Sequence, residues 1–269
     1  MVNGYKPSSL QEALEIRAAK DVVPYAGGTD LMVENRQGVS YLFLSKIPEL
    51  KEIRLDDEYV RIGAAVTFTQ ALESSLIPPL MKEAVSRIAA PAIRNAGTFG
   101  GNIGNGSAKA DSVLIHFVAD AKVRLVSLRG ERIVDIGQFY KGRKALDLAS
   151  DELIAEVLLP RTGLENYYYK KVGGRNALAI SRGLIVMDGD VIRHIAAAFG
   201  AVSGTVLRMR DLEKMFEGKT LAEAKACKDE ILSLYASRME LTRGRVSAEY
   251  RKAVCMNLLK DFLEEKGIS

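Results

Sequence analysis

Two glycine-rich clusters constrain the fold of this chain more than any other feature of its sequence. The first, Gly27-Gly28, lies between the strand-like run 22–25 and a segment that can begin a helix at Leu31. The second occupies residues 97–106 and contains Gly100-Gly101-Asn102. Glycine lets the backbone bend sharply and bring its N–H groups close to phosphate oxygens. Two such clusters predict a ligand with two phosphates, although either cluster alone also suits a tight strand-to-helix turn.

The common nucleotide-binding motifs do not explain these clusters. No Gly-x-Gly-x-x-Gly follows a predicted strand, so the fingerprint of a Rossmann dinucleotide site is missing. Gly218-Lys219-Thr220 resembles the end of a P-loop, but Glu213 stands where the first glycine of that motif belongs. The preceding residues also have a helical rather than a strand pattern. We therefore interpret this triplet as the end of a helix.

Hydrophobic periodicity and turn residues predict the order of helices and strands. Ser9 and Glu12 have the spacing of a capping box ahead of a helix that runs to Ala19. Turns at 56–58 and 129–131 each separate two strand-like runs and predict two hairpins. Beyond a boundary at 161–166, the pattern predicts three antiparallel strands followed by helices, at 167–172, 178–187, 191–199, 207–216, 229–239 and 247–265. The expected fold class is α+β, with a smaller C-terminal domain.

Length and charge exclude several classes of function. A chain of 269 residues is long enough for two domains. Its 38 basic and 34 acidic residues give a net charge of +4, without a block of like charges, so we expect no nucleic-acid binding. No apolar run reaches the roughly 18 residues of a membrane helix, and the first residues lack the apolar core of a signal peptide. We expect a cytoplasmic protein that does not enter a membrane.

Cysteine and histidine are too few to predict a metal centre in this chain. Cys227 and Cys255 are far apart and lie in helical segments, so they cannot ligate an iron–sulfur cluster or form a CxxC redox pair. We interpret each as a buried structural thiol. His116 and His194 are the only histidines, which makes a histidine-based metal site unexpected. Redox chemistry in this chain would therefore need a bound cofactor.

Longer segments around both clusters carry a resemblance to a known family. They are Tyr25-Ala26-Gly27-Gly28-Thr29-Asp30-Leu31 and Thr98-Phe99-Gly100-Gly101-Asn102-Ile103, the second followed by Asp111-Ser112. Together they resemble the FAD-binding subunit of the xanthine dehydrogenase family of molybdenum hydroxylases. Further matching segments follow in the expected order, at 61–64, 151–154, 171–175, 200–202 and 247–251. The resemblance covers nearly the whole chain.

The resemblance implies a fold and a domain division. Residues 1–165 would form an FAD-binding domain of the vanillyl-alcohol-oxidase (PCMH) type, with subdomains near 1–55 and 56–165. Residues 166–269 would form a C-terminal domain with a three-stranded antiparallel sheet and helices, like that of the carbon monoxide dehydrogenase flavoprotein. Catalysis would rest on the flavin, so we predict no catalytic acid or base among the side chains.

The resemblance also implies which residues bind FAD. Two walls would surround the pyrophosphate, at Pro24, Tyr25, Ala26, Gly27, Gly28, Thr29, Asp30 and Leu31 and at Thr98, Phe99, Gly100, Gly101 and Asn102. Asp111 would accept hydrogen bonds from the adenosine half or orient the loop, and Ile88, Ile154 and Lys171 match further flavin-contacting positions. Lys171 would place a positive charge near the reduced flavin. Without the resemblance, Asp111 equally suits a helix cap, Ile88 and Ile154 suit the core, and Lys171 suits an exposed strand position.

Two local departures from the family pattern affect the path of the second loop. Phe99 stands where a smaller aliphatic residue is usual, and 107–109 replaces a common Ser-Pro pair. Contacts that the backbone makes to phosphate are expected to remain. The acyl-CoA reductase branch carries an extra cysteine-ligated cluster, which two cysteines cannot build, so that branch is disfavoured.

In the family that this chain resembles, the redox steps are divided among subunits, which implies two partner chains. A molybdopterin subunit would oxidise the substrate, the [2Fe-2S] clusters of an iron–sulfur subunit would carry the electrons, and FAD on this chain would pass them to NAD+ or another acceptor. The expected assembly is a dimer of heterotrimers. Two other functions remain open at this point: a stand-alone FAD-dependent reductase of the same fold, and a flavin-free assembly or scaffold subunit. The matching C-terminal segments disfavour the first, and the intact glycines disfavour the second.

Overall fold

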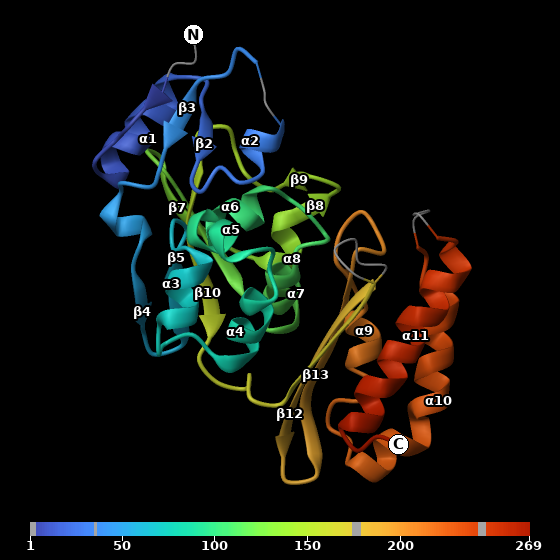
Figure 1. Cartoon of the computed structure of the whole chain (residues 1–269). Coiled ribbons are helices and arrows are strands. Elements are labelled where there is room, and N and C mark those ends of the chain that lie inside the picture. The colour runs from blue at the N-terminus through green and yellow to red at the C-terminus, as the bar shows by residue number, and fades with distance from the viewer. Residues whose placement is uncertain (1–3, 35–36, 174–178, 242–245) are drawn as a thin grey trace. The chain divides into compact units, whose positions relative to one another are not determined.

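Two units, each with its own sheets, appear in the computed structural model, which describes residues 4–34, 37–173, 179–241 and 246–269 (Figure 1). By contacts, the first unit contains residues 1–107 and 120–161, and the second contains residues 108–119 and 162–269. The division expected from the sequence, at residue 165, remains a prediction about domains. The contact-based units are not contiguous in the chain, because 108–119 packs with the C-terminal part.

The first unit begins with a three-stranded parallel sheet in the order β1-β3-β2. Its elements are β1 (Gly4–Tyr5), α1 (Leu10–Ala19), β2 (Val23–Tyr25), α2 (Leu31–Glu34) and β3 (Tyr41–Phe43). The predicted helix and strand are confirmed: the side chain of Ser9 caps α1 by accepting from the amide of Glu12. The chain leaves the carboxyl end of β2 and enters α2 through Gly27-Gly28. This strand–loop–helix turn presents backbone amides in the way that many anion sites do.

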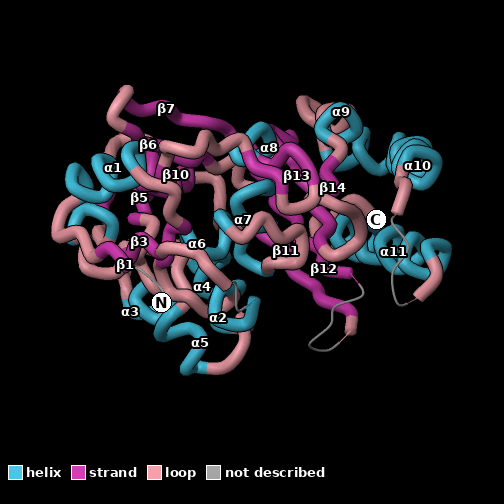
Figure 2. The backbone as a smooth tube through the Cα atoms, turned by 90° about the horizontal axis from the view of Figure 1, so that it is seen from above, coloured by secondary structure: helices cyan, strands magenta, loops and turns pink. Residues whose placement is uncertain are grey.

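The first unit also contains an antiparallel sheet of five strands, in the order β4-β5-β10-β6-β7. Its strands are β4 (Ile53–Leu55), β5 (Tyr59–Gly63), β6 (Lys122–Ser127), β7 (Gly130–Asp135) and β10 (Leu153–Pro160). Figure 2 shows β5, β10, β6 and β7 side by side in this order. The two hairpins predicted from turn residues are confirmed as β4–β5 and β6–β7. The central strand β10 is buried from Leu153 to Leu159, which explains its nearly continuous apolar run.

Glu156 interrupts that apolar run because three arginines from neighbouring strands neutralise it. Its carboxylate lies 2.7 Å from Arg54, 2.9 Å from Arg61 and 3.3 Å from Arg124. The residue is only 5% exposed. A buried carboxylate is tolerated when paired and hydrogen-bonded in this way.

Short elements lie between the strands of the first unit. They are η1 (Pro48–Leu50), α3 (Phe68–Glu73), α4 (Pro79–Ser86), α5 (Pro91–Ala96), α6 (Phe99–Gly104), α8 (Ile136–Phe139), β8 (Tyr140–Gly142) and β9 (Ala145–Leu146). Two of them, β8 and β9, pair as a separate two-stranded sheet. The sequence predicts an irregular stretch through Pro91 and the second glycine cluster, and this prediction is wrong. The stretch forms α5 and α6, because Pro91 starts one helix and Thr98 caps the other despite its glycines.

The second unit contains a four-stranded antiparallel sheet in the order β11-β12-β13-β14. Its elements are α7 (Asp111–Val118), β11 (Tyr167–Val172), β12 (Ala179–Asp188), β13 (Val191–Gly200), β14 (Leu207–Arg208), α9 (Arg210–Glu213), α10 (Leu221–Arg238) and α11 (Ala248–Glu265). The α+β class is confirmed, but the three-stranded sheet is a wrong prediction. The fourth strand has two residues, too short to show an alternating pattern, and it pairs with Ala198 and Phe199.

Two further predictions in this region are corrected by the structure. The predicted helix 207–216 is reduced to α9, because β14 takes its first residues. Gly218-Lys219-Thr220 is not the end of a helix but leads into one: Thr220 caps α10 and forms a capping box with Glu223. Gly218 is typical of a position after a helix end and Thr220 of an N-cap, so this short segment suits either the end or the start of a helix.

Helices cover both faces of the second sheet. A Cβ atom on Gly183 would lie 2.5 Å from the ring of Phe262 in α11, so α11 packs directly on that face. A Cβ atom on Gly200 would lie 2.6 Å from Leu114 in α7. Gly200 pairs with Ile180, which is three positions from Gly183 along β12. Because side chains alternate along a strand, α7 and α11 lie on opposite faces.

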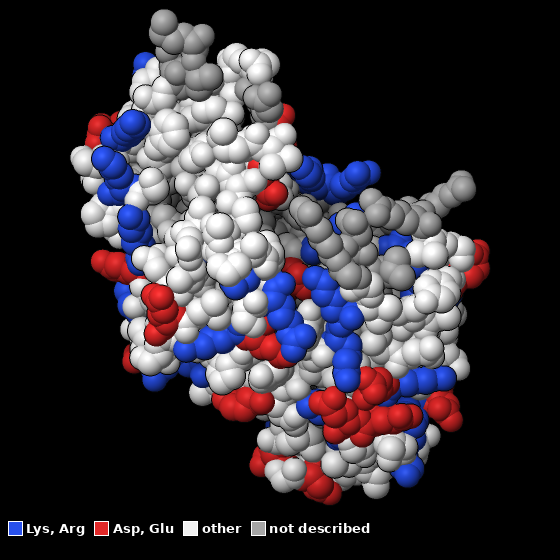
Figure 3. Space-filling view, viewed as in Figure 1, with Lys and Arg blue, Asp and Glu red and all other residues white. Residues whose placement is uncertain are grey.

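Charged side chains of both signs are interspersed on the visible face (Figure 3). Among the described residues, no helix is both long and apolar enough to cross a membrane.

Cys255 is buried as predicted, whereas Cys227 is only partly buried, and neither forms a disulfide. Burial raises the pKa of Cys255 to about 12, so it remains a thiol at neutral pH.

Candidate functional site

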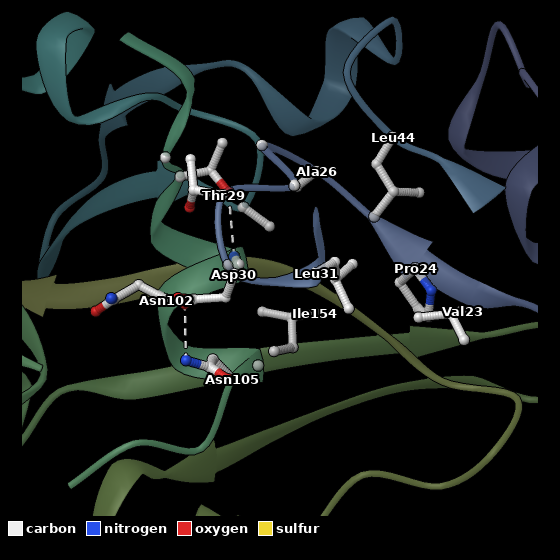
Figure 4. A pocket seen from close by; sticks show the side chains of 18 of the residues that line it. Val23, Pro24, Ala26, Thr29, Asp30, Leu31, Leu44, Asn102, Asn105 and Ile154 are labelled. Carbon is white, nitrogen blue, oxygen red and sulfur yellow. Dashed lines mark hydrogen bonds between the residues drawn. The ribbon is translucent and has the colours of Figure 1, made fainter. Parts of the chain in front are cut away.

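A cavity of about 320 Å³ in the first unit is lined by both glycine clusters (Figure 4). The first cluster and strand β2 contribute Val23, Pro24, Ala26, Gly27, Gly28, Thr29, Asp30 and Leu31. Helix α6 and its flanks contribute Thr98, Gly100, Gly101, Asn102, Gly104 and Asn105. The segment entering β10 contributes Leu148, Glu152, Leu153 and Ile154. Its size is within the range of sites for organic ligands.

The first cluster presents free backbone amides. From Ala26 to Leu31, no amide donates a hydrogen bond to another residue that the structure describes, and the next one, Met32, donates to the carbonyl of Gly28 at 2.9 Å. Gly28 has a φ of 68°, a left-handed conformation that favours glycine. This run of amides lies along the cavity and can donate to an anionic ligand.

The second cluster differs from the expectation that both clusters offer amides. The amides of Phe99 and Gly100 donate to the carbonyls of Val66 and Ala64, at 3.2 and 2.8 Å. Those of Gly101 and Asn102 donate to the hydroxyl and carbonyl of Thr98, at 3.1 and 2.9 Å. These bonds hold α6 in place, so the start of α6 is a rigid wall rather than a second set of donors.

The glycines of the second cluster have separate roles in that wall. A Cβ atom on Gly100 would lie 2.5 Å from the Cβ of Ala64, so packing requires this glycine. A Cβ atom on Gly104 would meet only Ile154, at 3.6 Å, and one on Gly101 would meet the Thr98 hydroxyl at 2.9 Å. Gly101 and Gly104 therefore leave bare backbone toward the cavity, where a ligand can approach closely.

Gly27 sets the distance between the two clusters. A Cβ atom at this position would lie 1.9 Å from the carbonyl oxygen of Ala96, which directly precedes the second cluster. The Asp30 carboxylate also accepts from the side-chain amide of Asn105 at 2.8 Å (Figure 4). Direct backbone packing and this hydrogen bond hold the two cavity walls together.

The third wall is positioned by an ion pair behind it. Arg132 donates to both carboxylate oxygens of Glu152, at 2.7 and 2.8 Å, and to Asp147 at 2.9 Å. The amide of Ala149 donates to Glu152 at 2.8 Å. Hydrogen bonding from Arg132 holds the pKa of Glu152 below its usual value, so this carboxylate is ionised at neutral pH. The segment that carries Leu148 and Ile154 is thereby anchored.

Three residues predicted to contact FAD do not line this cavity. The ring of Tyr25 packs against Tyr41 and Phe43, with centroid distances of 5.5 and 4.9 Å. Phe99 is buried against Phe68 at 5.3 Å, so the unusual residue at this position belongs to the core. Ile88 follows α4, and its carbonyl accepts from Arg94 at 2.8 Å. Their contact with FAD remains a prediction.

The remaining two predicted residues, Asp111 and Lys171, meet within the second unit. The ammonium group of Lys171 lies 3.0 Å from Oδ2 of Asp111. Asp111 is 8% exposed, and its Oδ1 is buried without a hydrogen-bond partner in the described part of the chain. Asp111 is the first residue of α7, whose N-cap is Ala110, so the alternative of a capping side chain is wrong. Lys171 is not a freely solvated lysine either.

Several residues of the cavity are not predicted by the sequence patterns. Five lining residues belong to neither glycine cluster: Arg17, Leu44, Lys144, Leu148 and Glu152. Asn105 was recognisable from its place within the second cluster. Arg17 and Lys144 come from α1 and the β8–β9 turn, and only the tertiary fold brings them to the cavity.

Both family comparisons fit this arrangement. The family described as the FAD binding domain in molybdopterin dehydrogenase matches residues 1–162. The chain belongs to the FAD-binding medium subunits of the molybdopterin-dependent hydroxylases. The family described as the CO dehydrogenase flavoprotein C-terminal domain matches residues 171–266 of the same subunit.

Relatives of this medium subunit match it along nearly its whole length. It is 30% identical over 278 residues to the xanthine dehydrogenase FAD-binding subunit of Escherichia coli O157:H7, covering 97% of this chain and 94% of the relative. It is 29% identical over 275 residues to the nicotinate dehydrogenase FAD-subunit of Eubacterium barkeri, covering 95% and 93%. In the structure of reconstituted CO dehydrogenase from Oligotropha carboxidovorans, a chain at 25% identity aligns with a TM-score of 0.88, covering 98% and 96%.

Features of the cavity fit a dinucleotide. The free amides from Ala26 to Leu31 suit the oxygens of a pyrophosphate, which needs several donors. The bare backbone at Gly101 and Gly104 lets such a group approach the opposite wall. Leu31, Leu44 and Ile154 add apolar surface for the rest of the ligand.

Proposed function

We propose that this subunit binds FAD with its pyrophosphate against residues 26–31 and transfers electrons from the [2Fe-2S] clusters of a partner to NAD+ or another acceptor. The observation that carries the proposal is the run of unpaired amides opposite the bare backbone of Gly101 and Gly104. The flavin, when bound, supplies the ability to exchange electrons singly or in pairs. The residues of this chain bind it, orient it and set the electrostatics around it.

The charge of the cavity supports an anionic ligand once its carboxylates are considered. Asp30 and Glu34 line the cavity, but each has a donor: Asn105 for Asp30, and Lys144 at 3.0 Å for Glu34. Glu152 is neutralised by Arg132. The free amides therefore provide the main unsatisfied hydrogen-bonding capacity facing the ligand, and it is of the donor type that phosphate needs.

The partners we propose are an iron–sulfur subunit and a molybdopterin subunit, assembled with this chain as a dimer of heterotrimers. Relatives that match along nearly their full length are named as FAD subunits or medium chains of dehydrogenases for xanthine, nicotinate and carbon monoxide. The match to the flavoprotein C-terminal family over 171–266 favours this assignment over a stand-alone reductase.

Asp111 and Lys171 are proposed to act on the redox ring as a donor and acceptor pair. Lys171 carries a positive charge that favours the reduced, anionic flavin, and Asp111 opposes it. Asp111 retains one buried oxygen without a partner in the described residues, so it can accept one more hydrogen bond. This pair would tune the reduction potential rather than take part in a proton transfer.

Substitutions of this pair should shift the flavin potential in opposite directions. We expect Lys171→Gln to lower the midpoint potential of bound FAD and Asp111→Asn to raise it, each by roughly 40 mV, which corresponds to about 1 kcal/mol for one electron. Spectroelectrochemical titration of the flavin measures both. Shifts of the same sign, or none, would show that the pair does not act on the flavin.

FAD content tests the central proposal directly. The chain purified alone should show a flavin absorbance spectrum and release FAD, not FMN, at close to one per chain. If the purified chain is colourless, titration of added FAD followed by calorimetry decides whether the site is intact. A chain that neither carries nor takes up FAD would contradict the proposal and favour a scaffolding role.

A further inference from the structure

Arg17 lies in the cavity wall and belongs to none of the matched motifs. It projects from α1, and its Nη1 donates to the backbone carbonyl of Val22. Val22 directly precedes β2, so the guanidinium lies at the Val23 side of the cavity. Figure 4 shows Val23, Pro24 and Leu44 on one side of the cavity and Asn102 and Asn105 on the other. The bond to Val22 therefore places the Arg17 guanidinium beside the start of β2.

The guanidinium of Arg17 has unused donors. Its Nε is buried and makes no hydrogen bond to any residue within the described ranges. Arg17 forms no ion pair with a carboxylate of those ranges, and Asp151 instead pairs with Arg129 at 2.7 and 2.8 Å. Burial lowers the pKa of Arg17 and the more distant charges of Asp21 and Asp151 raise it, but an arginine stays charged at neutral pH. A half-buried cation with open donors can serve a ligand.

The surroundings of Arg17 suit one half of FAD better than the other. The flavin ring has to remain reachable by electron donors and acceptors on other molecules, whereas the adenine does not. Besides Arg17, the cavity wall contains Leu44 and Leu153, which are 6% and 1% exposed. A planar cation in a wall that also carries buried leucines fits a heteroaromatic ring that bears several acceptor nitrogens.

We propose that Arg17 binds the adenine of FAD and is a specificity-determining residue for the adenine half of the cofactor. The guanidinium donates to a ring nitrogen of adenine or stacks on its face, while the amides of 26–31 hold the adjacent pyrophosphate. This inference rests on the proposed binding of FAD. A contact from Arg17 to the phosphates instead of the base is the alternative that the experiment separates.

Binding of FAD, ADP and inorganic pyrophosphate to the apoprotein, measured by calorimetry, tests the proposal. We expect Arg17→Met to weaken both FAD and ADP by roughly 10- to 100-fold, the usual range for loss of a charge-assisted hydrogen bond. Pyrophosphate binding should change by less than about threefold, within the scatter expected for a lost contact that the ligand never made. Arg87→Met, at an exposed arginine outside the cavity, is the matched control and should change none of the three.

Other patterns of FAD, ADP and pyrophosphate affinity would overturn the proposal. Equal losses for ADP and pyrophosphate would overturn the adenine contact in favour of a phosphate contact, and unchanged FAD and ADP binding would overturn any contact. If Arg17→Met does not fold, Arg17→Gln replaces it, because its side-chain amide can still donate to the Val22 carbonyl. A larger loss for ADP than for pyrophosphate in this variant would again indicate a contact with adenine, and equal losses a contact with phosphate. Failure of the wild-type chain to bind FAD would overturn the proposed function itself, whereas normal wild-type binding with an unaffected variant overturns only the role of Arg17.

Discussion

Gly101→Val is expected to abolish FAD binding while leaving the protein folded. A Cβ atom at this position would lie 2.9 Å from the Thr98 hydroxyl, which has to shift slightly, and 3.9 Å from the Cβ of Ala26. The added side chain therefore enters the space between the two clusters, where the pyrophosphate is proposed to lie. We expect the affinity for FAD to fall at least 100-fold, a loss of about 3 kcal/mol or more. Flavin absorbance of the purified variant and titration with FAD measure this loss.

Gly100→Val is the matched control, because it makes the same change one residue earlier. Its Cβ would lie 2.5 Å from the Cβ and 2.8 Å from the carbonyl oxygen of Ala64, which cannot move freely. Overpacking of this kind costs about 1–3 kcal/mol or more, so this variant should lose thermal stability even without flavin. If Gly101→Val binds FAD normally, or loses as much stability as Gly100→Val, then Gly101 does not face the ligand.

Glu213→Ala is expected to cause the largest loss of stability in the second unit. The single N–H on Nε of Arg208 is shared between both carboxylate oxygens of Glu213, at 3.0 and 2.9 Å, and Nη2 of Arg208 lies 2.9 Å from Oε2. The amide of Ala197 donates to Oε1 of Glu213 at 2.8 Å. The side chains of Arg208 and Glu213 are only 5% and 4% exposed. Removing one partner of a buried pair leaves an uncompensated charge, which costs about 3–5 kcal/mol. Urea unfolding of the apoprotein, followed by circular dichroism, measures the change.

Asp188→Ala provides the comparison for this second prediction. Asp188 pairs with Arg193, but both side chains are 63% exposed. Exposed pairs contribute roughly 0–1 kcal/mol, so we expect little change in the urea midpoint. Similar losses in the two variants would show that burial of the Arg208–Glu213 pair is not what makes it important.

Most elements held by interactions between residues close in sequence were predicted correctly, whereas some elements held by contacts between distant segments were not. The helix start at Ser9 was predicted because its cap, a bond from the amide of Glu12 to the Ser9 hydroxyl, needs only residues three positions apart. The hairpin β4–β5 follows from the turn residues between its strands. Elements α6 and β14 were missed because tertiary contacts stabilise them against weak local preferences. For α6, the amides of Phe99 and Gly100 bond to residues more than thirty positions away. Helix α5 was missed although Pro91 at its first position is a local start signal.

In the candidate site, the positions of the two loops could be predicted from the sequence, but the directions of some side chains could not. Most residues of the two glycine clusters line the cavity as the resemblance implies, because their backbone geometry is a local property of the motif. The side chains of Tyr25 and Phe99 instead pack away from it, against Phe43 and Phe68. Which way a side chain points in a loop depends on the apolar neighbours available to it, and those neighbours come from other parts of the fold.

The sequence by itself determined the family, the cofactor class, the main helices and strands and the two loops that carry the glycines. These depend on short-range patterns: caps, turns, alternating apolar residues and glycines at fixed positions. Only the tertiary structure decided that Gly27 packs on Ala96, that the second cluster uses its amides internally, that Lys171 meets Asp111 and that Arg17 reaches the cavity. Each of these is a contact between distant segments, and its energy depends on burial and on competing partners that local sequence does not specify.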